Sequence, residues 1–286
     1  MTGAPLPPID GIESAAVVGL GLIGGSIARD LLDRGVRVLA HDSRGDRLRA
    51  AAEPPLDRIQ LVDTLAGVEG AELVVLAVPV TAAPAVLARL LPHLARARLV
   101  VDVGSAKRTI VAAAEVLGVG ERFVGCHPLA GDHRSGWEAS RAGLFTRAPV
   151  YLCPSPSTGA EALARARALW TALGARPELI DAAEHDRLLA WTSHLPQSVA
   201  TALACALDAA GVARASLGPG GRDATRLAGS SPEMWAAVAA DNAEALAVAL
   251  AGMEAQLAAL RAAVEAGDAG GLRSFFAAGR EWYEER

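Results

Sequence analysis

Short apolar runs alternate with amphipathic stretches from the first residues of the chain to about residue 181. Apolar runs in this alternation predict strands of a mostly parallel sheet that is buried on both faces. The predicted strands are 17–18, 36–41, 72–78, 99–103, 123–126, 150–153 and 179–180. We therefore expect a doubly wound α/β sheet with helices on both faces.

The pattern changes after residue 181. Alanine-rich helical segments follow as far as the C-terminus, with interruptions at 218–221 and around 267–271. The string Ser231-Pro232-Glu233 is typical of a helix start, because serine caps the first turn, proline fits it and an acid suits the positive end of the helix dipole. The sequence thus predicts two domains: an α/β domain over 12–181 and a helical domain over 182–286.

A glycine-rich turn follows the first predicted strand. The string Gly19-Leu20-Gly21-Leu22-Ile23-Gly24 precedes a helical stretch and a second apolar run, which ends at Asp42. The first two glycines allow a tight turn close to a pyrophosphate, and the third lets the helix pack on its strand. We therefore predict a Rossmann-type domain with a dinucleotide at Gly19, Gly21, Leu22, Ile23 and Gly24. The alternative is a glycine turn in an α/β domain that binds no nucleotide.

Asp42 bears on which dinucleotide binds. It follows the glycines at about the 20-residue separation expected of a carboxylate that bonds the adenosine ribose hydroxyls. An acid there favours NAD, because it would repel a 2′-phosphate. Arg44 leaves NADP open, since its guanidinium would reach a 2′-phosphate if Asp42 turned away.

Composition limits the partners of the chain. Its net charge of −5 offers no basic field to nucleic acid or to an acidic membrane. No apolar run approaches the roughly 18 residues of a membrane helix, since Asp241, Asn242 and Glu244 interrupt the most apolar helical stretch, 236–251. The N-terminus lacks the basic start and apolar core of a signal peptide. We expect a cytoplasmic protein that binds neither nucleic acid nor a membrane.

The cysteines indicate neither disulfides nor a metal site. Cys126, Cys153 and Cys205 are an odd number and lack the spacing of metal ligands. They fit free thiols in a reducing compartment. We expect no bound metal.

Polar residues follow several predicted strands. Pro79 ends one strand, Gly104 and Ser105 follow another, and His127 ends a third. An open α/β sheet binds its ligand beyond the carboxyl ends of its strands, so groups capable of chemistry cluster where a nicotinamide would lie.

Five strings occur in order along the chain. They are GLGLIGGS (19–26), DVGSAK (102–107), HPLAGDHRSG (127–136), HDRLLAWTSHLPQ (185–197) and RDATRLAGSSPEMW (222–235). Together they closely resemble the prephenate dehydrogenase family of tyrosine biosynthesis, which includes arogenate dehydrogenases, over about residues 14 to 262. The resemblance implies a homodimer and an oxidative decarboxylation. Hydride leaves C4 of prephenate for NAD, carbon dioxide leaves C1, and the ring becomes aromatic.

The reaction requires a general base for the C4 hydroxyl, with a pKa near neutrality, and histidine fits. His127 matches the catalytic histidine of the family, and Ser105 matches its serine that hydrogen-bonds the substrate hydroxyl near the nicotinamide. The alternatives are structural: His127 would cap the turn after its strand, and Ser105 would cap a helix that begins at Lys107. Lys107 itself is expected to be a solvated first-turn lysine.

The remaining expected site residues would bind the dianionic substrate. Arg226 matches the carboxylate-binding arginine of the family, and Arg222 would share its face if this stretch is helical. His194 matches a substrate-contacting histidine on the first long helix of the second domain. Trp235 would wall the pocket or fill the core. His185 is expected to cap the start of its helix.

The side chain of the substrate stays open. His133 and Arg134 suit carboxylate or keto oxygens and favour prephenate, whereas Asp132 would suit the ammonium of arogenate. A 4-amino analogue of prephenate is a further alternative.

Two other classes of protein share this layout. An enzyme of the 3-hydroxyacid dehydrogenase type would carry a lysine on the first helix of the second domain, but no lysine follows Lys107. A dinucleotide-binding regulatory protein would not require Ser105, His127, His194 and Arg226 together.

Overall fold

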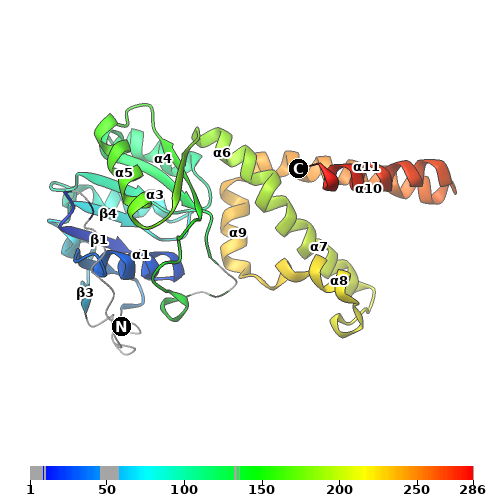
Figure 1. The fold of residues 1–286 in the computed structure, drawn as a ribbon, viewed down its shortest axis with the longest axis horizontal. Coiled ribbons are helices and arrows are strands. Elements are labelled where there is room, and N and C mark those ends of the chain that lie inside the picture. Colours follow the sequence, from blue (N-terminus) through cyan, green and yellow to red (C-terminus); the bar gives the residue numbers. More distant parts are fainter. Residues whose placement is uncertain (1–8, 10, 46–57, 132–133, 135, 286) are drawn as a thin grey trace.

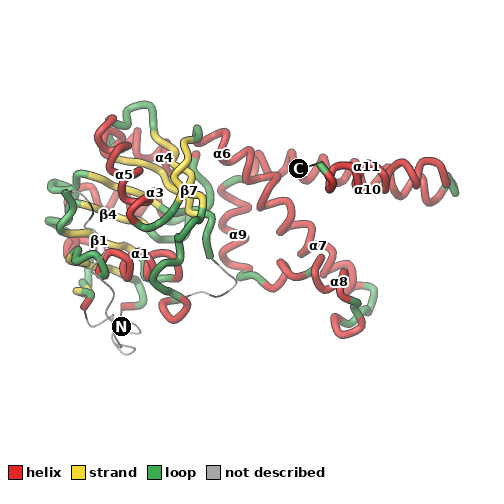
Figure 2. The backbone as a smooth tube through the Cα atoms, viewed as in Figure 1, coloured by secondary structure: helices red, strands yellow, loops and turns green. Residues whose placement is uncertain are grey.

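The computed structural model describes residues 9, 11–45, 58–131, 134 and 136–285. Figure 1 shows an α/β body and a helical part that extends away from it. Figure 2 shows that the strands lie in the body, together with helices and loops, and that the projecting part consists of helices joined by loops. This division agrees with the fold class expected from the sequence.

The body is built on one eight-stranded sheet in the order β3-β2-β1-β4-β5-β6-β7-β8. Neighbouring strands are parallel except β6 and β7, which pair antiparallel. The strands are β1 Ser14–Val18, β2 Arg37–His41, β3 Gln60–Leu61, β4 Leu73–Leu76, β5 Leu99–Asp102, β6 Phe123–Pro128, β7 Pro149–Pro154 and β8 Arg176–Leu179. The sequence did not predict β3, because two residues are too short to show a pattern.

Helices cover both faces of the sheet. The helices α1 Leu22–Leu32 and α5 Ala160–Ala172 pack on one face, and α3 Ala83–Leu90 and α4 Arg108–Val116 pack on the other. Alternate side chains of each strand enter opposite cores, as with Val17 on the α1 side and Val18 on the α3 side. Short 3₁₀ turns complete the body: η2 Leu65–Val68, η3 Leu91–His93, η4 Gly120–Arg122 and η5 Trp137–Ala139.

The helical part begins with one long interrupted helix. It consists of α6 Ala182–Leu189, the π-helical turn η6 Ala190–His194 and α7 Leu195–Ala209. Pro196 in the first turn of α7 has no N–H to donate to the preceding turn, and the wide π turn lies directly before it. His194 is the last residue of that turn.

Shorter and then longer helices follow: η7 Arg214–Ser216, α8 Pro219–Ala224, η8 Arg226–Gly229, α9 Pro232–Asp241, α10 Ala243–Glu265 and α11 Ala269–Glu284. The predicted start at Ser231 is confirmed, since its side chain accepts from the N–H of Met234 at 3.2 Å. The interruption expected at 218–221 lies earlier in the structure, between the end of α7 at Ala209 and the start of α8 at Pro219, because α8 includes Gly220 and Gly221. The interruption near residue 267 is confirmed by Gly267, whose φ is +63°.

Helices α10 and α11 form an antiparallel pair that projects from the body (Figure 1). By length and composition, α10 could span a membrane, which the sequence analysis did not foresee. Its buried residues are Leu246 and Ala249. Exposed large apolar residues on the pair are Val248, Leu257, Val264, Phe276, Trp282 and Tyr283. The pair therefore presents an apolar surface that the described chain leaves uncovered.

Candidate active site

The glycine turn between β1 and α1 has the form that a dinucleotide needs. Gly19 has a φ of +98°, and a side chain there would lie 2.3 Å from the carbonyl oxygen of Ala77. A side chain on Gly24 would lie 2.0 Å from the carbonyl oxygen of Gly19, so this glycine lets α1 pack closely. Nothing lies within 4 Å of a Cβ built on Gly21, the N-cap residue of α1. The open side of Gly21 therefore fits a pyrophosphate at the helix N-terminus.

Asp42 lies beside this turn, as expected. Its Oδ2 accepts from the N–H of Leu20 at 2.7 Å, and its Oδ1 accepts from the N–H of Arg44 at 2.8 Å. The guanidinium Nε of Arg44 lies 3.4 Å from the same Oδ1. The carboxylate is thus held next to the glycines, and Arg44 pairs with it.

The other predicted cofactor contacts lie along the same edge of the sheet. Leu22 and Ile23 begin α1 and are partly exposed, and the first turn of α1 has no acidic side chain. Pro79 is exposed in the turn after β4, and Ser105 is partly exposed in the turn after β5. The N-cap residue of α4 is Lys107 and makes no side-chain cap. The alternative in which Ser105 caps this helix is therefore wrong.

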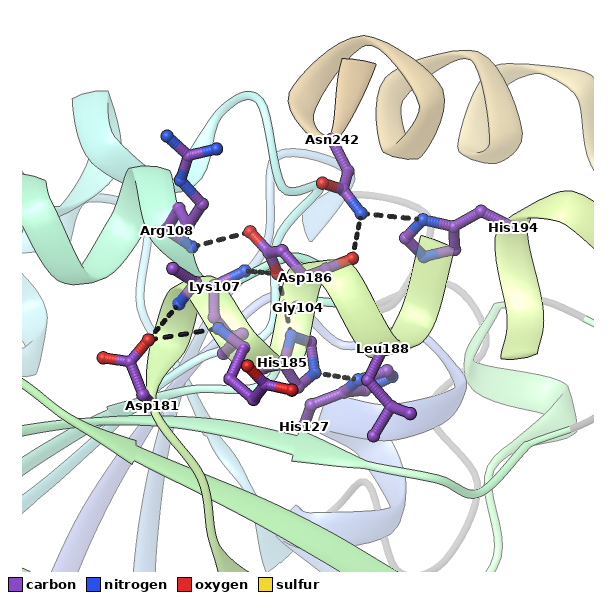
Figure 3. A network of polar contacts seen from close by, with 12 residues as sticks. Gly104, Lys107, Arg108, His127, Asp181, His185, Asp186, Leu188, His194 and Asn242 are labelled. Atoms are coloured by element: carbon purple, nitrogen blue, oxygen red, sulfur yellow. Dashed lines mark hydrogen bonds and ion pairs between the residues drawn. The ribbon is translucent and has the colours of Figure 1, made fainter. Parts of the chain in front are cut away.

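Three side chains connect the sheet to the helical part (Figure 3). Nδ1 of His127 in β6 lies 2.8 Å from Nε2 of His185, and Nδ1 of His185 lies 2.8 Å from Oδ1 of Asp186. Both His185 and Asp186 belong to α6. An ionised carboxylate only accepts, so a neutral His185 donates from Nδ1 and accepts at Nε2 from His127. This arrangement leaves the lone pair of His127 on Nε2.

Asp186 also lies at the N-terminus of α4. Its Oδ1 accepts from the N–H of Lys107 at 2.8 Å, and its Oδ2 accepts from the N–H of Arg108 at 2.9 Å. These are orphan donors of the helix, and the positive end of the dipole favours the negative charge. Burial raises the pKa of Asp186, but hydrogen bonds from His185, Arg108 and Lys107 outweigh this, and the pKa lies below its ordinary value. Asp186 is therefore ionised at neutral pH.

The two linked histidines are neutral under the same conditions. Burial lowers the pKa of His127 well below its ordinary value, and the neighbouring His185 ring and Lys107 ammonium lower it further. Burial also lowers the pKa of His185, against the opposing hydrogen bond to Asp186. A neutral His127 with its lone pair on Nε2 can act as a general base.

Lys107 is fully buried, so the expectation of a solvated lysine is wrong. Its ammonium pairs with the carboxylate of Asp102 and donates to the carbonyl oxygen of Cys126 at 2.9 Å. Asp102 also accepts from the N–H of Gly104 at 2.9 Å. The buried pair thus holds the ends of two neighbouring strands, including the backbone directly before His127.

His194 is buried at the end of η6. Its Nδ1 lies 3.1 Å from Nδ2 of Asn242, which also donates to the carbonyl oxygen of Asp186 at 2.7 Å. The ring of Trp235 packs edge-on at a centroid distance of 6.0 Å. Burial lowers the pKa of His194 to about 4. His194 is therefore a neutral member of the network that contains His127 (Figure 3).

A cavity of about 400 Å³ lies among α7, α9 and α10, with His194 and Trp235 in its lining. Gln197 also lines it and donates its amide N–H to the carbonyl oxygen of Leu227 at 2.8 Å. Nε2 of His194, Nε1 of Trp235 and Oε1 of Gln197 are buried and have no hydrogen-bond partner among the described residues. Such atoms are costly unless a ligand or water satisfies them, which makes this cavity a candidate for the substrate side chain.

Other predicted substrate contacts are not assembled with His127. Arg222 lies on α8 and Arg226 on η8, so the two do not share one helix, and both are exposed. His133 and its neighbour Asp132 lie outside the described residues, so the structure places neither.

Two family models match this chain. The prephenate dehydrogenase nucleotide-binding domain matches residues 27–179, and the prephenate dehydrogenase dimerization domain matches residues 181–278. The chain belongs to the prephenate dehydrogenase family. The two matches account for both parts of the fold and confirm the resemblance drawn from the sequence strings.

Curated relatives support this placement. The chain is 36% identical to the cyclohexadienyl dehydrogenase of Zymomonas mobilis over 91% of this chain and 92% of that protein. It is 30% identical to the prephenate dehydrogenase of Bacillus subtilis over 94% of this chain and 75% of that protein. Relatives of this family are dehydrogenases, which makes this chain an oxidoreductase.

Solved structures of the family have the same fold. Prephenate dehydrogenase from Aquifex aeolicus, in complex with hydroxyphenyl propionate and NAD⁺, aligns with a TM-score of 0.87 and 29% identity over 96% of this chain and 98% of that chain. Arogenate dehydrogenase from Synechocystis aligns with a TM-score of 0.78 and 32% identity over 94% of this chain and 99% of that chain.

The sequence analysis missed three members of the network. It expected His185 to cap its helix, but Asp181 caps α6 and His185 bridges His127 and Asp186. It assigned no role to Asp186 or Asn242. The adjacent His185 and Asp186 were a usable signal, because a helix that begins with a buried acid and histidine must satisfy both.

The glycine turn generates a first prediction. Gly21→Ala should leave the melting temperature unchanged, since a Cβ there meets nothing within 4 Å, but should weaken dinucleotide binding because the Cβ occupies the approach of the pyrophosphate. Titration calorimetry with NAD measures the binding. Gly279→Ala on α11, where a Cβ also meets nothing, is the matched control and should bind as wild type does. Equal affinities for NAD in Gly21→Ala and Gly279→Ala would contradict the placement of the pyrophosphate at Gly21.

The buried histidines generate a second prediction. The pKa values of His127, His185 and His194 are lowered in the folded protein, so below about pH 6.5 the unfolded chain binds more protons than the folded one. The resulting stability is present above that pH and is lost as the pH falls. The loss is about 1.4 kcal/mol per pH unit for each histidine that stays neutral. Urea unfolding at about pH 7.5 and about pH 5.5, on either side of the ordinary histidine pKa, measures this loss of stability. His194→Gln should make the stability depend less on pH. An unchanged slope of stability against pH would contradict the assignment of a buried, neutral His194.

Proposed function

We propose that this chain catalyses the oxidative decarboxylation of prephenate to 4-hydroxyphenylpyruvate in tyrosine biosynthesis, with NAD as the hydride acceptor. The observation that carries the proposal is the contact of His127 Nδ1 with His185 at the carboxyl edge of a sheet whose glycine turn fits a dinucleotide, because this contact leaves the lone pair of a neutral His127 on Nε2. The names of the relatives, prephenate dehydrogenase and cyclohexadienyl dehydrogenase, support the same chemistry.

His127 is the proposed base. Its Nε2 takes the proton of the C4 hydroxyl while the C4 hydride departs, and Ser105, on the strand end next to β6, orients that hydroxyl. The bound cofactor supplies the hydride acceptor. The C4 oxygen is then a carbonyl, carbon dioxide leaves C1, the ring becomes aromatic, and His127 returns its proton to the C4 oxygen. The gain in aromaticity drives the loss of carbon dioxide, so no metal is required.

Asp186 holds the base in its reactive form. With Asp186 ionised, His185 keeps its proton on Nδ1, and its Nε2 accepts a hydrogen bond from the Nδ1–H of His127. When His127 takes up the substrate proton, it becomes a cation linked through His185 to a buried carboxylate, which stabilises the charge. The two remote residues thus support the proton transfer without contact with the substrate.

NAD is favoured over NADP by the carboxylate of Asp42. Its side chain is 5% exposed and held by the N–H groups of Leu20 and Arg44, so it stays where a ribose hydroxyl would bind. Arg44 pairs with this carboxylate.

The proposal places the substrate between the two domains, which we divide at 181/182. Asp181 caps α6 there, directly after β8 ends at Leu179. His194 and Trp235 face the far end of the substrate from the helical domain. We further propose a cytoplasmic homodimer in which the apolar surface of α10 and α11 packs against a second copy, as the description of the matched domain suggests.

Spectrophotometric detection of NADH tests the function most directly. Purified protein is given prephenate or arogenate, each with NAD or NADP. We expect turnover with prephenate and NAD. Turnover only with arogenate would keep the mechanism and change the substrate, and turnover only with a 4-amino analogue would assign the enzyme to secondary metabolism. No turnover with any of them would overturn the proposal.

Replacement of the base gives a third prediction. His127→Asn should lower kcat by roughly 10²- to 10⁴-fold, the usual contribution of a general base, and leave the affinity for NAD unchanged. Stopped-flow NADH formation and NAD titration measure the two quantities. His93→Asn, at the end of η3, is the control and should retain wild-type kcat. A kcat for His127→Asn within about twofold of wild type would show that another group takes the proton.

The apolar helical pair gives a fourth prediction. Leu257→Arg places a charge on the exposed apolar surface of α10 and should convert a dimer into a monomer of 29.3 kDa, because burying an unpaired charge in an interface is costly. Light scattering after gel filtration measures the mass. Gln256→Arg, at the neighbouring exposed position, should remain dimeric. A monomeric wild type would exclude the proposed association.

A further inference from the structure

Asn242 lies at the junction of α9 and α10 and is 3% exposed. Its side-chain nitrogen is within hydrogen-bond distance of two acceptors, the carbonyl oxygen of Asp186 at 2.7 Å and Nδ1 of His194 at 3.1 Å. Figure 3 shows the amide between these two residues. The mechanism proposed above does not use Asn242, so its two contacts need a separate explanation.

The orientation of the Asn242 amide follows from its neighbours. The carbonyl oxygen of Asp186 can only accept, so the amide nitrogen and not the amide oxygen must face it. The same nitrogen has a second hydrogen, which points to Nδ1 of His194. Nδ1 of His194 is therefore an acceptor and carries no proton.

The proton of His194 must then be on the other nitrogen. Burial keeps the ring neutral, although the charge of Asp186 opposes this effect. A neutral imidazole with an acceptor at Nδ1 is a donor at Nε2. Nε2 of His194 is buried and has no hydrogen-bond partner among the described residues. The Nε2–H of His194 is therefore a buried donor without an acceptor among the described residues.

His127 has the opposite arrangement. It donates from Nδ1 to His185 and keeps a lone pair on Nε2. Both histidines are connected to Asp186, His127 through the carboxylate and His194 through the main-chain carbonyl. One residue thus gives two histidines opposite protonation at Nε2: one accepts a proton and the other donates a hydrogen bond.

We propose that Asn242 is a positioning residue that holds His194 as a hydrogen-bond donor to the oxygen-bearing side chain of the substrate. This inference rests on the proposed function, since it needs a substrate with a carboxylate or keto oxygen at the end remote from C4. Asn242 acts only through His194 and touches no reacting atom. Because it begins α10, it also connects the exposed helical pair to the active site.

Nitrogen NMR of histidine-labelled protein tests the assignment without turnover. In the wild type, His194 should show a proton on Nε2 and none on Nδ1. In Asn242→Asp the new carboxylate accepts from Nδ1, so the proton should move to that nitrogen. Asn242→Leu, an apolar replacement of similar size, removes the donor without adding an acceptor and should give a mixture of the two forms. A wild-type His194 protonated on Nδ1 would overturn the proposal, whether or not either variant folds.

Binding of hydroxyphenyl propionate to the NAD-loaded protein provides the second readout. Loss of a hydrogen bond to a charged oxygen should raise its Kd by roughly 10- to 100-fold in Asn242→Asp and by less in Asn242→Leu. Glu244→Gln, two residues further along the chain, is the matched control: it removes an exposed ion pair with Arg108 and should change neither the Kd nor the His194 signal. Equal Kd values in all four proteins would also overturn the proposal.

The two readouts separate this inference from the proposed function. If the wild type fails to oxidise prephenate but His194 carries its proton on Nε2 and the Kd changes as expected, the substrate assignment fails and the role of Asn242 stands. If prephenate is oxidised and the proton lies on Nδ1, the role of Asn242 fails and the function stands.

Discussion

The rest of the site depends on the hydrogen bonds that the buried carboxylate of Asp186 accepts. A buried charge is tolerable only when hydrogen bonds and opposite charge replace its water, and here the N-terminus of α4 and His185 do so. Because Asp186 belongs to α6 and α4 belongs to the sheet domain, the same contact fastens the two domains together. Its charge then determines where the protons lie on His185 and His127. Domain docking and the protonation of the base therefore have one physical cause.

Most of the fold was predictable because its signals are local. Parallel strands buried on both faces are continuous apolar runs, and the turn from β1 to α1 needs glycines whose absent side chains prevent clashes of 2.3 and 2.0 Å. The prediction failed where local signals are weak or ambiguous. β3 has two residues, and Gly220 and Gly221 lie inside α8 although glycine is a poor helix former. The uncovered apolar surface of α10 is a property of assembly, so periodicity alone did not show it.

The site was predictable to a smaller extent. The positions of His127 and Ser105 near strand ends were predictable, because they follow from the apolar runs that form β5 and β6. The network was not found, because His127 and His185 are 58 residues apart and meet only when the domains dock. Lys107 resembles a surface residue in the sequence, yet its partner Asp102 draws it into the core. The prediction for Arg222 and Arg226 failed for a local reason. Their spacing suggested one helical face, but α8 ends between them and Arg226 begins a separate 3₁₀ turn.

Neutron diffraction from crystals of the protein at neutral pH tests the central claim most directly, because it locates the hydrogen atoms. The account predicts an ionised Asp186, a neutral His185 with its proton on Nδ1, and a neutral His127 with its proton on Nδ1 and none on Nε2. A proton on Nε2 of His127, or a proton on the carboxylate of Asp186, would contradict it.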